Sequence, residues 1–363
     1  MKIGILTFHC ALNYGAVLQA YGLQEYLKCL GHEVSVIDYR PAYLTDQYNV
    51  FKWYWNPDDS IVRNVMLLIR NLIVLPVRLK RKKRFADFIG KYLNIRQYRP
   101  NGGLSDFDAF VFGSDQIWNP KLTQGFDKVF FGFFPDACGK KLISYAASAG
   151  SVECIQPYEN TFLSMLSAYT HVSSREQSVA EWIHRHLPET KCYVTLDPVL
   201  LADKSVFTSI ADKKKSREPY LLIFKLAADE PDTVSDIAKK IAGQKRLHIL
   251  ELVSVEYVRN LSAISSATLE RFISLFRDAS YVITTSYHGM VFSMLFEKDF
   301  NYIGLQGRSI ERIDYLLSEL GLSNRKVVPG SDAIADTIDY EKVNLILQKK
   351  RDDSRNFIRQ ALT

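Results

Sequence analysis

Apolar and polar positions along the first forty residues follow the pattern of a strand, a helix and a second strand. The apolar run Ile3–Phe8 predicts a strand, and a short polar loop follows it. Apolar residues then recur at helical spacing as far as Leu30, and Gly31 closes this predicted helix. Glu33–Asp38 predicts the next strand. A strand-helix-strand unit requires a parallel sheet with a right-handed crossover, so the predicted fold class is α/β.

Two further series of strands follow, separated by the charged stretch 211–218. The first series is predicted at 109–112, 142–146, 171–173 and 192–195, with helices at 157–168 and 177–186. The second is predicted at 220–225, 247–251, 281–284 and 299–303, with a helix at 232–242. We therefore expect two Rossmann-like β/α domains facing a cleft. Their predicted bounds are 1–205 and 219–340, with a linker at 206–218 and a C-terminal helix at 341–363 that packs back on the first domain.

The composition is that of a folded protein. Of 363 residues, 47% are hydrophobic and 24% are charged, which excludes a disordered or collagenous chain. The five cysteines are widely spaced and include no Cys-x-x-Cys pair, so we predict neither a disulfide framework nor a structural metal. No uncharged apolar stretch reaches the ~18 to 20 residues of a membrane span. A cytoplasmic location is the expectation.

The net charge of +6 is concentrated in one segment. Between Ile61 and Phe85 there are eight basic residues and no acidic one. On a helix, the polar residues of 61–78 form one stripe opposite a broad apolar face. A helical insertion at about 58–90 that docks on an anionic membrane surface through 61–84 is one interpretation. The alternative is a helix that packs its apolar face on the first domain. Nucleic-acid binding is not expected, because no aromatic platform accompanies the charges.

Polar clusters follow three predicted strands of the first domain, where parallel sheets bind ligands. The loop after the first strand allows a ligand to approach the backbone, or else only caps the helix. The cluster after 109–112 suggests sugar binding, with a carboxylate at the hydroxyls and an indole on the sugar face, or else a structural turn. The small residues 144–150 leave room for a ligand or for close backbone packing. The candidate acceptor residues are Asn13, Tyr14, Gly15, Ser114, Gln116 and Trp118, with Asp115 as a candidate base.

Two further clusters suggest an anion site. Arg175 lies at the start of a predicted helix, where a cation is unfavourable unless an anion or an acidic side chain lies nearby. The stretch 284–289 joins a predicted strand to an apolar helix and contains Ser286, His288 and Gly289. A helix N-terminus binds anions, and a histidine there supplies a titratable proton. A histidine satisfied within the core is the alternative.

Seven stretches, in this order, resemble the polysaccharide pyruvyl transferase family. They are NYGAVLQAYGLQEYL, GHEVSVIDYRP, FDAFVFGSDQIWNP, ISYAASAG, VSSREQS, VTLDPVLL and TTSYHGMVFSMLF. The resemblance implies a GT-B-like enzyme that takes phosphoenolpyruvate and attaches pyruvate as a cyclic ketal across two sugar hydroxyls. It implies no cofactor. The expected acceptor is a capsular or exopolysaccharide precursor, an undecaprenyl-diphosphate-linked oligosaccharide ending in galactose that receives a 4,6-ketal.

The resemblance also assigns roles to residues. The family's Arg-x-His element falls on Ser286, Tyr287 and His288, so the histidine carries over and the arginine does not. Arg175 matches another family arginine, and Arg308 is a weaker substitute for the missing one. We expect His288 to act as general acid and to bind the donor with Arg175, Ser286, Gly289 and Arg308. Two alternatives stay open: a glycosyltransferase that uses a nucleotide sugar, and a non-catalytic sugar-binding subunit.

Overall fold

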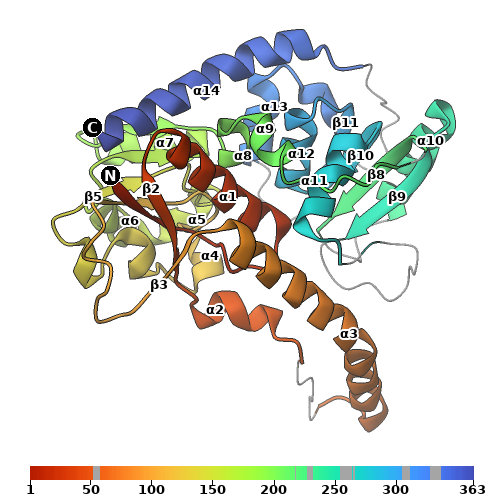
Figure 1. Cartoon of the computed structure of the whole chain (residues 1–363), viewed down its shortest axis with the longest axis horizontal. Coiled ribbons are helices and arrows are strands. Elements are labelled where there is room, and N and C mark those ends of the chain that lie inside the picture. The colour runs from red at the N-terminus through yellow and green to blue at the C-terminus, as the bar shows by residue number, and fades with distance from the viewer. Residues whose placement is uncertain are drawn as a thin grey trace.

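The first half of the chain builds a five-stranded parallel sheet in the order β3-β2-β1-β4-β5 (Figure 1). The computed structural model describes residues 1–51, 58–216, 218–226, 232–253, 264, 266–304, 311–327 and 337–363. The strands are β1 (Lys2–Leu6), β2 (Glu33–Asp38), β3 (Ile95–Gln97), β4 (Ala109–Phe112) and β5 (Lys141–Ser144). Two isolated bridges connect the β5 edge to a parallel pair, β6 (Val172–Ser174) and β7 (Cys192–Val194).

The second half builds another five-stranded parallel sheet, in the order β12-β11-β10-β8-β9. Its strands are β8 (Tyr220–Lys225), β9 (His248–Val253), β10 (Tyr281–Thr284), β11 (Phe300–Ile303) and β12 (Lys326–Val327). The predicted α/β class with two Rossmann-like sheets is confirmed, and the first sheet has the strand order of a dinucleotide-binding fold.

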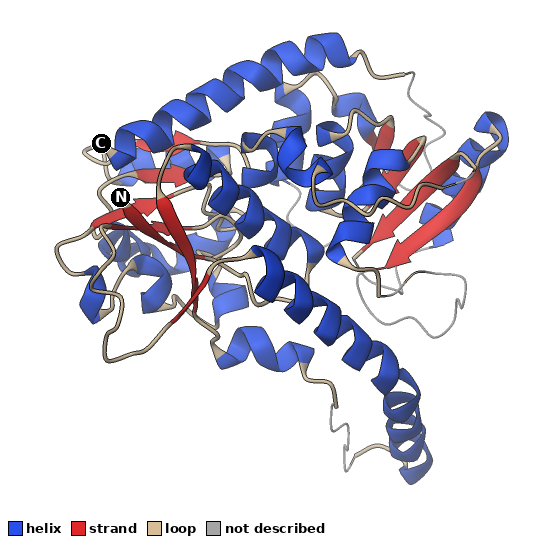
Figure 2. Ribbon diagram, viewed as in Figure 1, coloured by secondary structure: helices blue, strands red, loops and turns tan. Residues whose placement is uncertain are grey.

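Helices connect the strands and pack on the sheets (Figure 2). They are α1 (Tyr14–Cys29), α2 (Ala42–Thr45), α3 (Ile61–Tyr92), α4 (Pro120–Thr123), α5 (Val152–Ile155), α6 (Glu159–Leu166), α7 (Gln177–His186), α8 (Pro198–Leu201), α9 (Lys204–Thr208), α10 (Asp232–Lys245), α11 (Leu269–Asp278), α12 (Tyr287–Leu295), α13 (Glu311–Glu319) and α14 (Tyr340–Leu362). Among the described residues, no helix is long and apolar enough to cross a membrane.

The strands predicted from apolar runs are confirmed within about two residues at each end, the usual margin for element ends. The sequence analysis missed β3 and β12, which are the edge strands of the two sheets. They contain three and two residues, too few for a hydrophobic period to be visible. The predicted boundary at residue 205 falls inside α9, which contacts both α1 and α11. The domain bounds therefore stay a prediction.

Helices α1 and α8 from the first half pack directly against helices of the second half. Helix α8 contacts α1, α12 and α14, and α1 also contacts α11. Tyr14, the first residue of α1, is fully buried, and its ring stacks on Phe272 at 4.6 Å between centroids. Its hydroxyl donates to the carbonyl of Ala267 at 3.0 Å. The two halves thus share one continuous core, which includes both Tyr14 and Phe272.

Helix α14 spans both halves of the molecule (Figure 1). At its start, the Tyr340 hydroxyl donates to the carbonyl of Lys298 at 2.6 Å, in the second half. Toward its end, Arg351 donates to the carbonyl of Leu200 at 2.8 Å, and the Ser354 hydroxyl accepts from the amide of Leu196 at 3.0 Å, both in the first half. The last helix therefore holds the two halves together.

The N-terminal half of helix α3 turns its polar side, not its apolar side, toward the protein, which is the reverse of the packing that the sequence analysis gave as an alternative. Its polar residues Asn64 and Asn71 are buried, whereas eight apolar side chains between Ile61 and Leu79 are exposed. Asn71 accepts from Arg78 at 2.6 Å, and Asn64 donates to the carbonyl of Asp59. The expectation that the apolar face packs on the first domain is wrong for this half of the helix, because the hydrogen-bonded polar stripe takes the inner side.

Removal of the Tyr14 ring should destabilise the junction of the two halves. We expect Tyr14→Ala to lower the free energy of unfolding by about 3–5 kcal/mol, the range for deleting a large buried aromatic side chain. Tyr14→Phe removes only the hydroxyl and should cost about 1 kcal/mol. Urea denaturation measures both, with the half-exposed Tyr158→Ala as the matched control. Equal effects of Tyr14→Ala and Tyr158→Ala would contradict this assignment.

Candidate functional site

Side chains from the carboxyl ends of four strands meet around the carboxylate of Asp197. Asp197 follows β7, and its side chain is fully buried. Arg175, which follows β6, donates to it at 2.6 Å. The hydroxyl of Ser114, after β4, lies 3.5 Å from the same oxygen, and so does Nε2 of His288, after β10. Since β10 belongs to the second sheet, this cluster joins the two halves.

The charges of this cluster compensate one another. Burial alone would raise the pKa of Asp197, but His288 and Arg175 outweigh burial and hold the pKa well below its usual value. Burial likewise lowers the pKa of Arg175, but Tyr287 and the carboxylates of Asp197 and Asp115 more than compensate and raise it. The carboxylate of Asp197 and the guanidinium of Arg175 therefore both stay charged near neutral pH.

His288 lies against the first turn of α1. A Cβ atom added to Gly15 would lie 2.1 Å from Cγ of His288, closer than any two such atoms can approach. Only glycine at position 15 leaves room for this ring. The imidazole is 12% exposed and has Asp197 as its nearest carboxylate. Gly15 and Asp197 thus fix the position of His288 from the first half of the molecule.

Two guanidinium groups lie over the buried ring of Tyr287. Arg175 Cζ is 4.8 Å from the ring centroid, and Arg312 Cζ, at the start of α13, is 5.1 Å from it. Arg312 donates to the hydroxyl of Ser148 at 3.4 Å, and its Nε atom is buried and has no hydrogen-bond partner within the part of the chain that the structure describes. Among the described residues, no carboxylate lies within ion-pair distance of Arg312. Burial, and then the charge of Arg175, lower the pKa of Arg312.

A cavity of about 210 Å³ opens beside these two arginines. The end of β7, helix α13 and helix α14 enclose it. Three cationic side chains line it, together with two carboxylates and two tyrosines; these are Arg175, Arg312, Lys350, Asp197, Asp353, Tyr287 and Tyr315. Guanidinium and ammonium groups that line one cavity are a usual recognition set for phosphate and carboxylate groups. The cavity is therefore suited to a small anionic ligand.

A second cavity, of about 360 Å³, lies between α3 and the carboxyl ends of β1 and β2. Its lining includes Cys10, Leu12, Arg40, Tyr48, Lys82 and Phe85. Burial, and also the negative charge of Asp115, raise the pKa of Tyr48 to about 12. Asp115 itself lies 3.6 Å from Arg175. Of this pair, Arg175 lines the first cavity.

The sequence model of the polysaccharide pyruvyl transferase family matches residues 13–306 of this chain. The chain belongs to this family. The match includes all four strand ends of the cluster around Asp197 and stops just before Arg312. The resemblance drawn from the seven sequence stretches is confirmed.

Similarities to solved structures are more distant, and no curated protein matches the chain. The structure of Staphylococcus aureus MnaA with UDP has a TM-score of 0.48 at 9% identity, over 99% of this chain and 90% of that one. Neisseria meningitidis UDP-GlcNAc 2-epimerase bound to UDP-GlcNAc has 0.48 at 11%, over 99% and 94%. The Streptomyces nogalater glycosyltransferase SnogD has 0.41 at 9%, over 98% and 96%. We draw nothing about substrates from similarities this distant.

Two residues expected to bind ligands in this member of the pyruvyl transferase family are helix caps, and a third is a site of close packing. Asn13 accepts from the amides of Gly15 at 2.9 Å and Ala16 at 3.4 Å, which is the capping alternative for this loop. Ser286 caps α12 by accepting from the amide of Gly289 at 3.4 Å. A Cβ atom on Gly289 would lie 2.2 Å from the Thr284 hydroxyl, so Gly289 permits close packing there.

Two expected acceptor residues are buried in the core, which corrects the sequence analysis. Trp118 is 0% exposed and packs among Phe131, Phe162 and Tyr169, so its indole presents no face to a sugar. Tyr14 lies between the two halves, as described above. Gln116 is partly exposed, and its side-chain oxygen accepts from Asn119 at 2.9 Å. Arg308 lies outside the described residues.

The sequence analysis missed Asp197 and Arg312. Asp197 follows the predicted strand 192–195 and belongs to the family stretch VTLDPVLL, so the rule of polar residues at strand ends would have found it. Glu176, beside Arg175, is not its ion-pair partner: it accepts from the hydroxyls of Ser148 and Ser174. Arg312 gives no such signal, because it lies in an ordinary amphipathic helix and only the packing of α13 brings it to Tyr287.

A methyl group at position 15 should displace His288. We expect Gly15→Ala to lower the free energy of unfolding by about 1–3 kcal/mol, the usual cost of overpacking. Gly15→Ala combined with His288→Ala should recover most of this loss in a double-mutant cycle. Gly90→Ala is the control, because Gly90 is also helical and nothing lies within 4 Å of its added Cβ atom. A simple sum of the two single effects would contradict the contact.

The Asp197 carboxylate should make stability depend on acid pH. Its folded pKa is depressed, so its contribution is complete above the unfolded pKa of about 3.9 and is lost as pH falls toward the folded value. Asp197→Asn breaks the buried pair with Arg175 and should cost about 3–5 kcal/mol at pH 7. This deficit should shrink below about pH 4 in urea denaturation. A deficit that stays constant down to the lowest accessible pH would contradict the depressed pKa.

Proposed function

We propose that this protein transfers the enolpyruvyl group of phosphoenolpyruvate onto two hydroxyls of a sugar, forming a pyruvate ketal on a polysaccharide precursor. Family membership supports pyruvyl transfer in general. The observation that carries the choice of donor is the pair of guanidinium groups over Tyr287, of which Arg312 has no carboxylate partner among the described residues. Phosphoenolpyruvate bears a carboxylate and a phosphate, and so presents two anionic groups to two guanidinium forks.

Arg312 takes the place of the family arginine that position 286 lacks. Ser286 is committed to capping α12, so it offers no charge to a donor. Arg312 reaches the same Tyr287 ring from α13 instead. We assign Arg175 and Arg312 to the donor; Lys350, which pairs with Glu319, lines the same 210 Å³ cavity. This assignment does not require Arg308, which lies outside the described residues.

The proposed chemistry begins with protonation of C3 of phosphoenolpyruvate by His288. This step makes C2 electrophilic, and one sugar hydroxyl forms a C–O bond there and gives up its proton. The bond from C2 to the phosphate oxygen then breaks, and the second hydroxyl closes the ketal. Of the two hydroxyl protons, one replaces the proton that His288 gave and the other leaves with phosphate. Asp197 positions His288, and Asp115 is the candidate base for the acceptor hydroxyls.

We place the acceptor in the 360 Å³ cavity. Its apolar and aromatic lining, Leu12, Tyr48 and Phe85, suits a sugar face, and Arg40 and Lys82 suit a diphosphate. This assignment replaces Trp118 and Tyr14, which are buried. The proposed acceptor is a lipid-linked oligosaccharide such as an undecaprenyl-diphosphate galactoside, which would bring the enzyme to the inner face of a membrane.

Calorimetric titration with phosphoenolpyruvate tests the donor assignment. We expect binding by the wild-type protein and a loss of about 10-fold or more in affinity for Arg175→Ala and for Arg312→Ala, since a charged hydrogen bond contributes about 1.5–3 kcal/mol. His288→Ala should bind the donor but lose about 10²- to 10⁴-fold in the rate of phosphate release with acceptor present.

Arg96→Ala is the matched control, because Arg96 is exposed and pairs with Asp106 at the far edge of the first sheet. It should titrate like the wild type. Binding of a nucleotide sugar in place of phosphoenolpyruvate would favour a glycosyltransferase and overturn the donor assignment. Donor binding without any phosphate release, even with a range of acceptors, would favour a non-catalytic subunit.

A further inference from the structure

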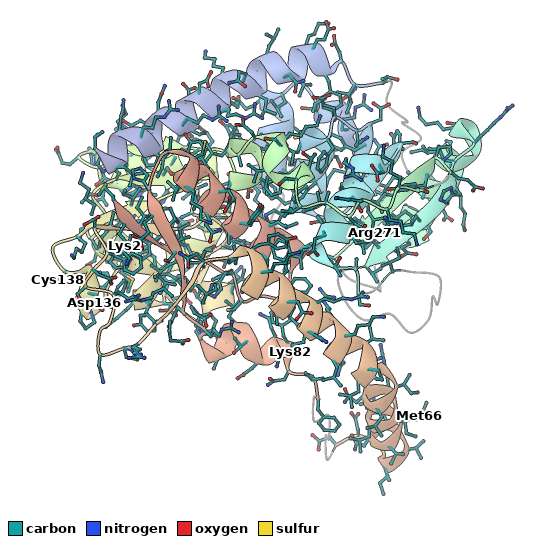
Figure 3. The ribbon with its side chains drawn as sticks, in the orientation of Figure 1. Lys2, Met66, Lys82, Asp136, Cys138 and Arg271 are labelled. Atoms are coloured by element: carbon teal, nitrogen blue, oxygen red, sulfur yellow. The ribbon has the colours of Figure 1, made fainter. Side chains whose placement is uncertain are left out.

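We infer that helix α3 docks this protein on an anionic lipid bilayer through the face it exposes between Ile61 and Lys83. Helix α3 has 32 residues, which corresponds to about 48 Å at 1.5 Å per residue. Its C-terminal half packs on the first domain through Phe85, Phe88 and Ile89. Its N-terminal half projects away from the rest of the molecule (Figure 1). Figure 3 shows Met66 on this projecting part and Lys82 close to the body.

The projecting part exposes apolar side chains to an unusual degree. Half of the large hydrophobic side chains that are exposed in the described residues lie on this one helix; they are Ile61, Val62, Val65, Met66, Ile69, Leu72, Ile73 and Leu79. Exposure reaches 73% at Ile61 and 60% at Ile73. At about 100° per residue these eight positions fall within one arc of about 140°. A contiguous apolar face of this kind marks a surface that is covered in the working protein.

The positive charges of α3 favour an anionic lipid surface as the partner that covers its apolar face. Lys80 and Lys83 continue the apolar arc toward the body, and both are exposed. Arg70 lies at the margin of the arc, and no acidic residue occurs from Ile61 to Phe85. An apolar arc with cations at its end and margin is the arrangement that inserts into the headgroup region of anionic membranes. A second copy of this chain would bring the same cations together, which charge repulsion disfavours.

Hydrogen bonds on the inner face of α3 fix the rotation of the helix about its axis. Asn71 holds Arg78, which also donates to the carbonyl of Val50 at 3.2 Å, and Arg81 donates to the carbonyl of Leu12 at 2.6 Å. These bonds orient the polar stripe inward and therefore the apolar arc outward. This inference does not depend on the proposed function, since it uses neither the donor residues nor the cavity beside Arg175.

Vesicle co-sedimentation of the full chain tests the docking. We expect binding to phosphatidylcholine vesicles that contain about 30% phosphatidylglycerol, and at least 10-fold weaker binding to pure phosphatidylcholine. Lys80→Gln with Lys83→Gln should weaken binding about 30-fold, from about 1 kcal/mol per lysine. Met66→Ser with Ile69→Ser and Ile73→Ser should weaken binding at least as much, because these exposed side chains provide the apolar insertion.

Two matched controls keep the result specific. Leu345→Ser with Ile346→Ser removes exposed apolar side chains from α14, and Lys213→Gln with Lys215→Gln removes exposed charges elsewhere; both should bind like the wild type. All variants should keep the wild-type unfolding midpoint and affinity for phosphoenolpyruvate, so a failure of docking is distinguishable from a failure of the proposed function. Equal binding to both vesicle types would overturn the inference, and so would unchanged binding of either α3 variant. Absence of vesicle binding, together with self-association of the wild type that the serine variant abolishes, would also overturn it, because the apolar face would then contact a second copy of the chain.

Discussion

The rest of the site depends on the interactions that stabilise the buried carboxylate of Asp197. An ionised carboxylate in the interior is stable only if cations and donors surround it, and removal of one partner leaves the others uncompensated. Here Arg175 donates to it, His288 lies 3.5 Å away, and its other oxygen caps α8 by accepting from the amide of Val199. Because these partners come from both halves of the chain, the charge balance of Asp197 also fixes how the halves meet.

The candidate site forms only where the two halves of the chain contact each other, because each half contributes some of its residues. Gly15 has no side chain where His288 needs its space, and Tyr14 extends the core from α1 into the second half. The catalytic assignment to His288 and the stability of the junction therefore rest on adjacent residues of one helix turn. A substitution there is expected to affect folding and the proposed chemistry together, and a comparison of stability with activity separates the two effects.

The sequence contains enough to predict the strands, the fold class and the two residues at the centre of the site, Arg175 and His288. Strand prediction works because buried parallel strands are continuous apolar runs, and Arg175 and His288 meet at Asp197 because each follows the carboxyl end of such a strand. The same reasoning fails for Trp118 and for α3, because an aromatic or amphipathic pattern does not say which side faces inward. It fails for Arg312 because no local pattern tells that α13 packs its first turn against Tyr287.

Helix α14 determines how the molecule can move. Its first turns are bonded to the second half and its last turns to the first half, and an α-helix is stiff along its axis. The two halves are therefore connected twice, once by the chain near α9 and once by helix α14. A two-domain enzyme joined by a single linker is free to open like a hinge, whereas here a second connection, bonded to both halves, restrains such opening. The 210 Å³ cavity is lined by Lys350 and Asp353 of that same helix, so entry of a ligand and the mechanics of the junction involve the same residues.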